Sequence, residues 1–209
     1  MTLQAIEKAV KYQHLCVNGA LHVTLGEVRT LVLLGPSEPG FWGHFTASGE
    51  YSDGRADPLD RWSDRVISNL ANLLDAQAFF PFGGPSYQPF IQWARGSGQA
   101  HVSPVGLLVH DRMGLWLSYR GALGLKQRLD LPETPPSPCL SCEKQPCVTA
   151  CPVNALKPES YDVAACKADL ETKENHCMSK GCAVRRACPV SQEYGREEAQ
   201  SAFHMEAFK

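Results

Sequence analysis

The chain has 209 residues, of which 44% are hydrophobic, and a formal net charge of −2. This length allows one larger domain or a domain with a smaller companion, and the near-neutral charge gives no electrostatic reason to expect a nucleic-acid or anionic-membrane partner. The first residues, MTLQAIEKAVKYQ, are charged and lack the apolar core of a secretory signal. Nowhere do eighteen apolar residues run together. We therefore expect a cytoplasmic protein.

The first forty residues predict one helix and several strands. Leu3, Ile6 and Val10 recur at helical spacing. Residues 14–25 then suggest two short strands around Asn18-Gly19, a dipeptide favoured in tight hairpin turns. Residues 30–34 form an apolar, β-branched run before Gly35-Pro36, which is typical of a buried central strand.

A Gly- and Ser-rich stretch follows and predicts a loop up to residue 56. Asp57 is then a plausible helix N-cap, and Pro58 suits the first helical position. Apolar residues at spacings of three and four continue to about residue 76 and predict an amphipathic helix.

The next segment alternates between irregular and regular patterns. Residues 79–85 combine aromatic residues with Pro and Gly and interrupt regular structure, and residues 88–95 suggest a short helix. Residues 104–110 and 115–119 predict a hairpin around Asp111-Arg112-Met113-Gly114.

Four prolines in residues 131–138 predict a linker. It separates a mixed α/β domain over residues 1–130 from a cysteine-rich domain over residues 139–209. The division follows the cysteines, because Cys16 stands alone and the other eight lie between positions 139 and 188. In a reducing cytosol such a grouping points to metal rather than to disulfides. Cys16 is expected to be a small buried apolar residue.

The eight cysteines form two motifs that each end in Cys-Pro. The first is Cys139-x2-Cys142-x4-Cys147-x3-Cys151-Pro152, and the second ends in Cys188-Pro189. In two-cluster ferredoxins, three cysteines of a motif hold one 4Fe–4S cluster and the fourth, before Pro, reaches the other cluster. This logic predicts two interleaved ligand sets. The first thiol set is Cys139, Cys142, Cys147 and Cys188; the second thiol set is Cys151, Cys166, Cys177 and Cys182.

Other interpretations of the eight cysteines stay open. Two structural zinc sites would also use eight thiolates, although zinc sites usually show paired C-x2-C knuckles and only Cys139–Cys142 has that spacing here. Disulfides, or one cluster with four spare cysteines, are further alternatives. The x4 gap before Cys147 and the wide spacing of the last three cysteines depart from the usual ferredoxin pattern.

The cysteine order, together with AACKADLET around Cys166, resembles the ferredoxin module of epoxyqueuosine reductases. That resemblance implies two 4Fe–4S clusters, a nitroreductase-like core and a cobalamin. The matching enzymes carry a catalytic Asp before a helix start that contains Pro. The corresponding residues here, Gly84-Pro85-Ser86-Tyr87-Gln88-Pro89, include no carboxylate, so reduction of an epoxide would lack its general acid.

The first part of the chain is similar to another corrinoid family, the cobalamin-processing proteins of methylmalonic aciduria and homocystinuria type C. The similar stretches are LVLLGPSEPGFWGHF, ADPLDRW and LLVHDRMGLWLSYRGALGL. The two resemblances imply an α+β fold: a nitroreductase-like corrinoid-binding core with a C-terminal ferredoxin-like two-cluster domain. A homodimer is expected only by analogy with nitroreductase-like domains.

The corrinoid would be held by an aromatic loop and by the YRG segment. In the loop, glycine backbone can lie close to a flat macrocycle, although an ordinary aromatic turn in the core explains the same residues. The resemblance assigns Arg120 to the cavity, against the alternative of a salt bridge on a strand. The predicted cofactor-binding residues are Phe82, Gly83, Gly84, Pro85, Tyr87, Tyr119 and Arg120.

Three more residues have two interpretations each. His110 is either an axial cobalt ligand or a hydrogen-bonded structural histidine at the end of a strand. Arg185 and Arg186 form either a solvated face or a docking patch for an acidic electron donor.

These features predict an iron–sulfur electron-transfer protein that binds cobalamin and reduces its cobalt, an oxidoreductase of the cob(III)/cob(II)alamin reductase type. Its partner would be a low-potential electron donor: a ferredoxin, a flavodoxin or a reductase. The alternatives are an epoxyqueuosine-reductase-like enzyme acting on a modified nucleoside, a non-catalytic cobalamin carrier or ferredoxin, and a flavin-bound form.

Overall fold

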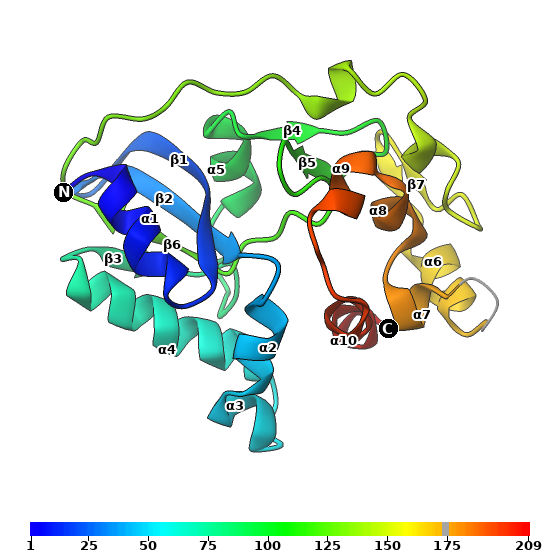
Figure 1. Cartoon of the computed structure of the whole chain (residues 1–209), viewed down its shortest axis with the longest axis horizontal. Coiled ribbons are helices and arrows are strands. Elements are labelled where there is room, and N and C mark those ends of the chain that lie inside the picture. Colours follow the sequence, from blue (N-terminus) through cyan, green and yellow to red (C-terminus); the bar gives the residue numbers. More distant parts are fainter. Residues whose placement is uncertain (173–175) are drawn as a thin grey trace. The chain divides into compact units, whose positions relative to one another are not determined.

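The structure is a computed structural model that describes residues 1–172 and 176–209. It is a mixed α+β protein with two compact units (Figure 1). The front unit comprises Met1–Gln99 and Ser118–Pro135, and the cysteine unit comprises Ala100–Leu117 and Pro136–Lys209. Within the described residues, no helix has both the length and the apolar character needed to cross a membrane.

The front unit is a four-stranded antiparallel sheet with helices around it. The strand order is β1-β2-β6-β3, and every neighbouring pair is antiparallel. The strands are β1 (Leu15–Leu25), β2 (Val28–Pro36), β3 (Gln77–Phe79) and β6 (Gly121–Leu125). The helices are α1 (Leu3–Lys11), α2 (Phe41–Thr46), α3 (Gly49–Ser52), α4 (Pro58–Leu73) and α5 (Phe90–Gly96).

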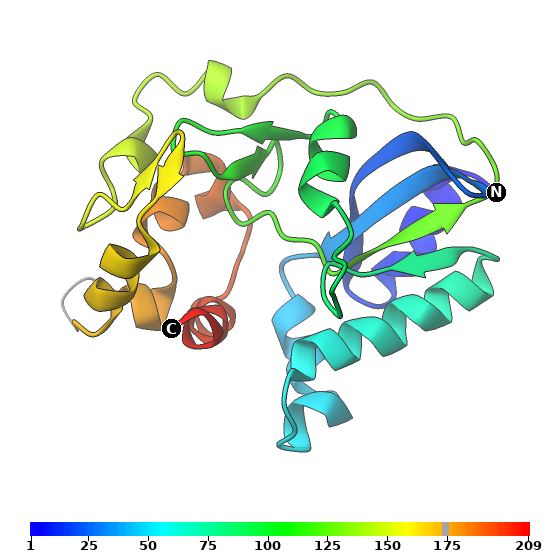
Figure 2. The same ribbon diagram turned by 180° about the vertical axis from the view of Figure 1, so that it is seen from behind.

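Helix α4 runs along the sheet in both views (Figures 1 and 2) and contacts β3 and β6. As predicted, Pro58 opens the helix and the apolar positions form its buried face, which includes Trp62 and Ile67. The packing is tight, since a Cβ added at Gly121 on β6 would come within 2.7 Å of Ile67 Cδ1. Asp57 is the N-cap residue as predicted, although its side chain makes no capping hydrogen bond.

Residues 15–25 form one strand, so the predicted hairpin at Asn18-Gly19 is wrong. The pairing of β1 with β2 shifts register between Val17 and Gly19, which is the signature of a β-bulge. The Asn18 side chain is fully buried there, and its Nδ2 donates to the Ser118 carbonyl at 2.9 Å. The Asn18 side chain therefore makes a hydrogen bond at the point where the bulge interrupts the regular pairing, and the strand continues instead of turning.

Cys16 is not simply an apolar filler. It is half-buried on β1, and its sulfur lies 3.1 Å from both Asn18 Oδ1 and the Pro36 carbonyl oxygen, so that its single S–H can donate to either. Cys16 thus takes part in the hydrogen bonding of the bulge.

The cysteine unit takes its elements from two stretches of the chain. The first stretch contributes a hairpin of β4 (Ala100–Val102) and β5 (Leu108–His110). The second contributes two 3-10 helices, η1 (Pro138–Leu140) and η2 (Pro146–Val148), and the short strands β7 (Leu156–Lys157) and β8 (Ser160–Tyr161). Its helices are α6 (Val163–Leu170), α7 (Cys177–Lys180), α8 (Ala183–Ala187), α9 (Pro189–Glu193) and α10 (Glu198–Phe208).

The predicted hairpin of residues 104–110 with 115–119 is therefore wrong, because β5 pairs with β4 instead. His110 and Gly114 exchange two backbone hydrogen bonds, of 3.1 and 2.9 Å, which close a tight turn after β5. The Leu115 N–H then donates to Ser191 Oγ at 2.8 Å instead of to a strand partner.

This pairing also changes the division of the chain. The predicted first domain over residues 1–130 included residues 100–117, which the structure groups with the cysteines. The chain passes from one unit to the other after Pro135, inside the predicted linker of residues 131–138. The cysteine unit is thus larger than residues 139–209.

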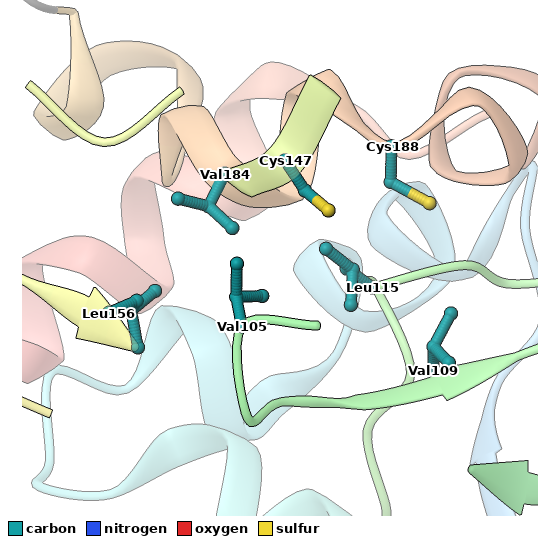
Figure 3. Packing of buried hydrophobic residues seen from close by; sticks show 7 residues of the cluster. All are labelled: Val105, Val109, Leu115, Cys147, Leu156, Val184 and Cys188. Atoms are coloured by element: carbon teal, nitrogen blue, oxygen red, sulfur yellow. The ribbon is translucent and has the colours of Figure 1, made fainter. Parts of the chain in front are cut away.

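The core of the cysteine unit includes cysteines as well as aliphatic residues. Figure 3 shows the Cys147 and Cys188 side chains projecting towards the layer that contains Leu115 and Val109. The buried members of this cluster are Val105, Val109, Leu115, Cys147, Leu156, Val184 and Cys188.

Candidate metal centre

The four cysteines of the first thiol set line one cavity of about 200 Å³. Short elements bring them there: Cys139 lies in η1, Cys147 lies in η2, and Cys188 joins α8 to α9. Each of the three lies directly beside a proline that begins a helical turn, which fixes the local backbone. The sequence therefore holds these thiols in place through rigid turns rather than through long helices.

The rest of the cavity wall is mainly apolar. Val109 and Leu115 contribute from the β4–β5 stretch, and Val190 contributes from α9. Apolar walls reduce the contact with water on their side of the cavity, and solvent exposure is one determinant of a cluster's reduction potential.

The second thiol set occupies a different part of the same unit. Cys166 lies in α6, Cys177 begins α7, and Cys182 precedes α8. The backbone N–H of Ala155 donates to Cys151 Sγ at 3.2 Å.

Charge interactions group the thiols in the same two sets. Burial raises the pKa of the Cys139 and Cys147 thiols, and the neighbouring thiolates of Cys188 and Cys142 raise both further. Ligand thiols with raised pKa values must lose protons when they bind a metal.

In the second set, burial again raises the pKa of Cys166, and the charges of Cys182 and Cys151 add to the effect. Burial and the charge of Cys182 raise the pKa of Cys177 as well. The thiols that influence one another's pKa values thus belong to the same predicted ligand set. That they bind a cluster stays a prediction.

The first thiol set fits a 4Fe–4S cluster. Its cavity far exceeds the roughly 10–15 Å³ that one water molecule needs, and four soft thiolates are the ligands that such clusters use. Among the residues described, no three His, Cys, Asp or Glu side chains gather closely enough to hold a single metal ion. All nine cysteines, each within the described part of the chain, are free of disulfides.

The expectation that Arg185 and Arg186 form a solvated face is wrong. Arg185 donates through Nη1 to the Leu115 carbonyl and lies within the electrostatic reach of Cys182 and Tyr161. Arg186 donates through Nε to the Gly181 carbonyl at 3.0 Å. Both side chains are only half-exposed and hold backbone carbonyls of the cysteine unit.

His110 is a structural residue of the cysteine unit. It is fully buried, and its Nδ1 accepts the Arg112 backbone N–H at 3.1 Å and lies 2.7 Å from Asp111 Oδ1. Burial lowers its pKa to about 4, so the imidazole is neutral at physiological pH. This matches the hydrogen-bonded alternative for His110.

The predicted corrinoid loop lies in the front unit and packs on itself. The Tyr87 ring covers Gly84 so closely that a Cβ there would approach within 2.7 Å of the ring. Gly83 has a left-handed φ of 80° and no atom near its would-be Cβ. Pro85 lies between Gly84 and Tyr87, whose side chain is 68% exposed.

The Arg120 side chain is held by other residues of the front unit. Its Nε donates to Ser63 Oγ at 2.9 Å and its Nη2 pairs with Asp60, both on α4. The guanidinium also lies over the Phe82 ring, 5.5 Å from the centroid. This is the salt-bridge alternative, strengthened by a cation–π contact.

Tyr119 is the one member of the predicted corrinoid set with an unexplained polar group. Its hydroxyl is buried without a hydrogen-bond partner in the described structure, and burial raises its pKa. Taken together, these side chains do not fit a corrinoid in this conformation, since Arg120 is engaged by Asp60 and the face of Gly84 is covered by Tyr87.

One further residue at the candidate metal centre was not predicted from the sequence. Ser103 lines the same cavity as the first thiol set, from the turn between β4 and β5. It lies 36 positions before Cys139 in a stretch expected to belong to the other domain, so only the strand pairing reveals it. Comparisons with protein-family models, with curated proteins and with solved structures found no match to this chain.

Proposed function

We propose that this chain is an electron-transfer protein that carries two 4Fe–4S clusters in its cysteine unit. One observation supports this most directly: Cys188, from the second motif, lines the same cavity as three cysteines of the first motif. Crossing of the cysteine before Pro is the arrangement expected of a two-cluster ferredoxin.

The clusters, when bound, supply one-electron redox chemistry. The chain positions the thiolates, and the buried side chains of Val109 and Leu115 form an apolar part of the wall beside the first set. The N–H of Ala155 donates to Cys151 Sγ and favours the more negative form of the second set. The reducing cytoplasm is the compartment we propose, because nine cysteines without disulfides are stable there.

The test is reversible reduction. Protein reconstituted with iron and sulfide without oxygen should show a broad absorption near the visible region that bleaches when a low-potential donor, such as reduced ferredoxin or flavodoxin, is added. It should then pass these electrons on to a dye acceptor over many turnovers. Colourless protein with nine titratable thiols would overturn the proposal.

We also propose the finer fold, a nitroreductase-like front unit and a ferredoxin-like cysteine unit, on the basis of the resemblances. The stretches similar to the cobalamin-processing family fall on β2 with α2, on the beginning of α4, and on β5 through β6. A homodimer of the front unit belongs to the same proposal.

A cobalamin is the electron acceptor that the resemblances favour. The buried, unpartnered hydroxyl of Tyr119 supports a ligand near this residue, whereas the contacts of Arg120 and Tyr87 would have to change first. We therefore derive no reaction step through the corrinoid. Retention of hydroxocobalamin on gel filtration, with a changed spectrum, supports the acceptor, and free passage of the cobalamin rejects it.

A further inference from the structure

A serine hydroxyl that makes no hydrogen bond to the described residues lies in the cavity of the first thiol set. Ser103 is 4% exposed and lines the cavity together with Cys139, Cys142, Cys147 and Cys188. Its Oγ is buried and has no hydrogen-bond partner in the described structure. A buried hydroxyl without a partner loses its hydrogen bonds to water without replacing them, so native proteins seldom keep one without a reason.

Backbone hydrogen bonds hold the turn that carries Ser103. The Ser103 N–H donates to the Leu107 carbonyl at 2.9 Å, and the Gly106 N–H donates to the Ser103 carbonyl at 3.0 Å. Gly106 has a left-handed φ of 78°, and a Cβ added there would lie 2.8 Å from the Pro158 carbonyl oxygen. These contacts restrain the backbone of the turn and so hold the Cα of Ser103 at the cavity wall.

The four cysteines of the first thiol set line this cavity together with Ser103. Most of the other lining residues are apolar or proline, including Pro104 and Val109, and the remaining polar ones are Ser141 and Gln145. Thiolates and cluster sulfides are anionic acceptors, and hydrogen bonds to anionic acceptors are stronger than neutral ones. A cluster held by the first thiol set would therefore offer the partner that Ser103 lacks.

We propose that the Ser103 hydroxyl donates a hydrogen bond to a sulfur of the cluster held by the first thiol set and raises its reduction potential. The inference rests on the proposed function and names a positioning and tuning residue for it. The cluster takes up one electron from the donor, and no covalent bond forms or breaks. The hydrogen bond stabilises the reduced cluster more, because that form carries the greater negative charge.

Ser141 provides the matched control. It lines the same cavity and lies within the first motif, but it is exposed and its hydroxyl already donates to the Pro138 carbonyl at 3.2 Å. Ser103→Ala and Ser141→Ala thus delete the same atom from the same cavity wall. Ser103→Ala should fold, because it removes a hydroxyl that has no protein partner.

The experiment is redox titration of the anaerobically reconstituted chain, followed by electron paramagnetic resonance. With Ser103→Ala we expect an unchanged iron content. The equilibrium constant for reduction of one cluster should fall about tenfold, which lowers its reduction potential by about 59 mV for a one-electron couple. The second cluster should keep its potential. Ser141→Ala should match the wild type, and Ser103→Thr, which keeps the hydroxyl, should restore the potential.

Three results would overturn the inference. Equal potentials in Ser103→Ala and the wild type would show that the hydroxyl does not contact the cluster. An equal shift in Ser141→Ala would show that any hydroxyl in this wall acts alike, and loss of iron from Ser103→Ala would make its role structural. Wild-type protein that assembles no cluster would reject the proposed function itself, and the iron count separates that failure from the others.

Discussion

Cys147 and Cys188 come from different cysteine motifs, yet they line one cavity and share one buried core cluster. The candidate ligands are therefore also packing residues of the cysteine unit. Because ligands and core coincide, binding free energy at the thiols contributes to folding free energy. A small unit with short helices commonly needs such a metal centre for stability.

The interleaved sets predict a specific loss of iron. Cys188→Ser should remove the first cluster and leave about four irons of about eight, because serine is a poor ligand for iron in place of a soft thiolate. Cys182→Ser should remove the second cluster and leave a similar count. Iron analysis and electron paramagnetic resonance distinguish the two remaining clusters.

Cys16→Ser is the control, since Cys16 lies in the front unit and its thiol bonds Asn18. It should keep all the iron. The same remaining cluster spectrum in Cys188→Ser and Cys182→Ser would contradict the partition.

Arg120→Ala should lower the free energy of unfolding by about 1–2 kcal/mol. The change removes charge-assisted hydrogen bonds to Ser63 and Asp60 and the contact with Phe82. Half-exposed Asp60 remains solvated, which limits the loss. Thermal or urea unfolding measures the difference.

Arg65→Ala is the comparison, because Arg65 pairs with Glu50 while 51% of its side chain is exposed. We expect a loss below about 1 kcal/mol for this exposed pair. If both variants were equally stable, the buried position of Arg120 would have no energetic effect.

Gly35→Ala should destabilise the front unit strongly. A Cβ at Gly35 would lie 2.0 Å from Asn18 Nδ2 and 2.2 Å from the Ser118 carbonyl oxygen. The methyl group would break the hydrogen bond between these two groups, so we expect a loss of about 3 kcal/mol.

Gly43→Ala in α2 is the matched substitution, since no atom lies within 4 Å of its would-be Cβ. It should leave stability unchanged or raise it slightly, because Ala favours a helix over Gly. Chemical denaturation of both variants compares them directly, and a stable Gly35→Ala protein would refute the bulge packing.

The cysteine unit should lose stability as the pH falls from about 6.5 to about 4. In the unfolded chain His110 takes up a proton near pH 6.5, whereas in the folded chain burial lowers its pKa to about 4. The facing charges are Asp111, which opposes this shift, and Arg112 and His101, which add to it. The unfolded state thus binds more protons in this window, and stability decreases with decreasing pH.

The full effect is about 3 kcal/mol, from 1.36 kcal/mol per pKa unit. His110→Gln should remove this part of the pH dependence, and urea titrations between pH 7 and pH 4 measure it. Parallel curves for the variant and the wild type would show that His110 does not titrate as described.

The sequence was sufficient where a local pattern decides the structure. Pro58 and the apolar spacing after it predicted α4, and the apolar run at residues 30–34 predicted the buried part of β2. The grouping of Cys188 with the first motif also followed from the sequence, because the Cys-Pro order reflects a recurring crossover.

The sequence was not sufficient where contacts between residues far apart in the chain decide the local structure. Asn18-Gly19 has the form of a turn, but the Ser118 carbonyl binds the Asn18 side chain from 100 positions away, and β1 continues through a bulge. Residues 115–119 have strand character, but Ser191 takes the N–H of Leu115. Likewise Ser103 joins the metal centre only because β5 pairs with β4.

The most direct test of the central claim is the count of iron and acid-labile sulfide in chain purified without oxygen. Two 4Fe–4S clusters predict about eight irons and about eight sulfides per chain. About two zinc ions per chain without sulfide, or no bound metal at all after reconstitution, would contradict the account.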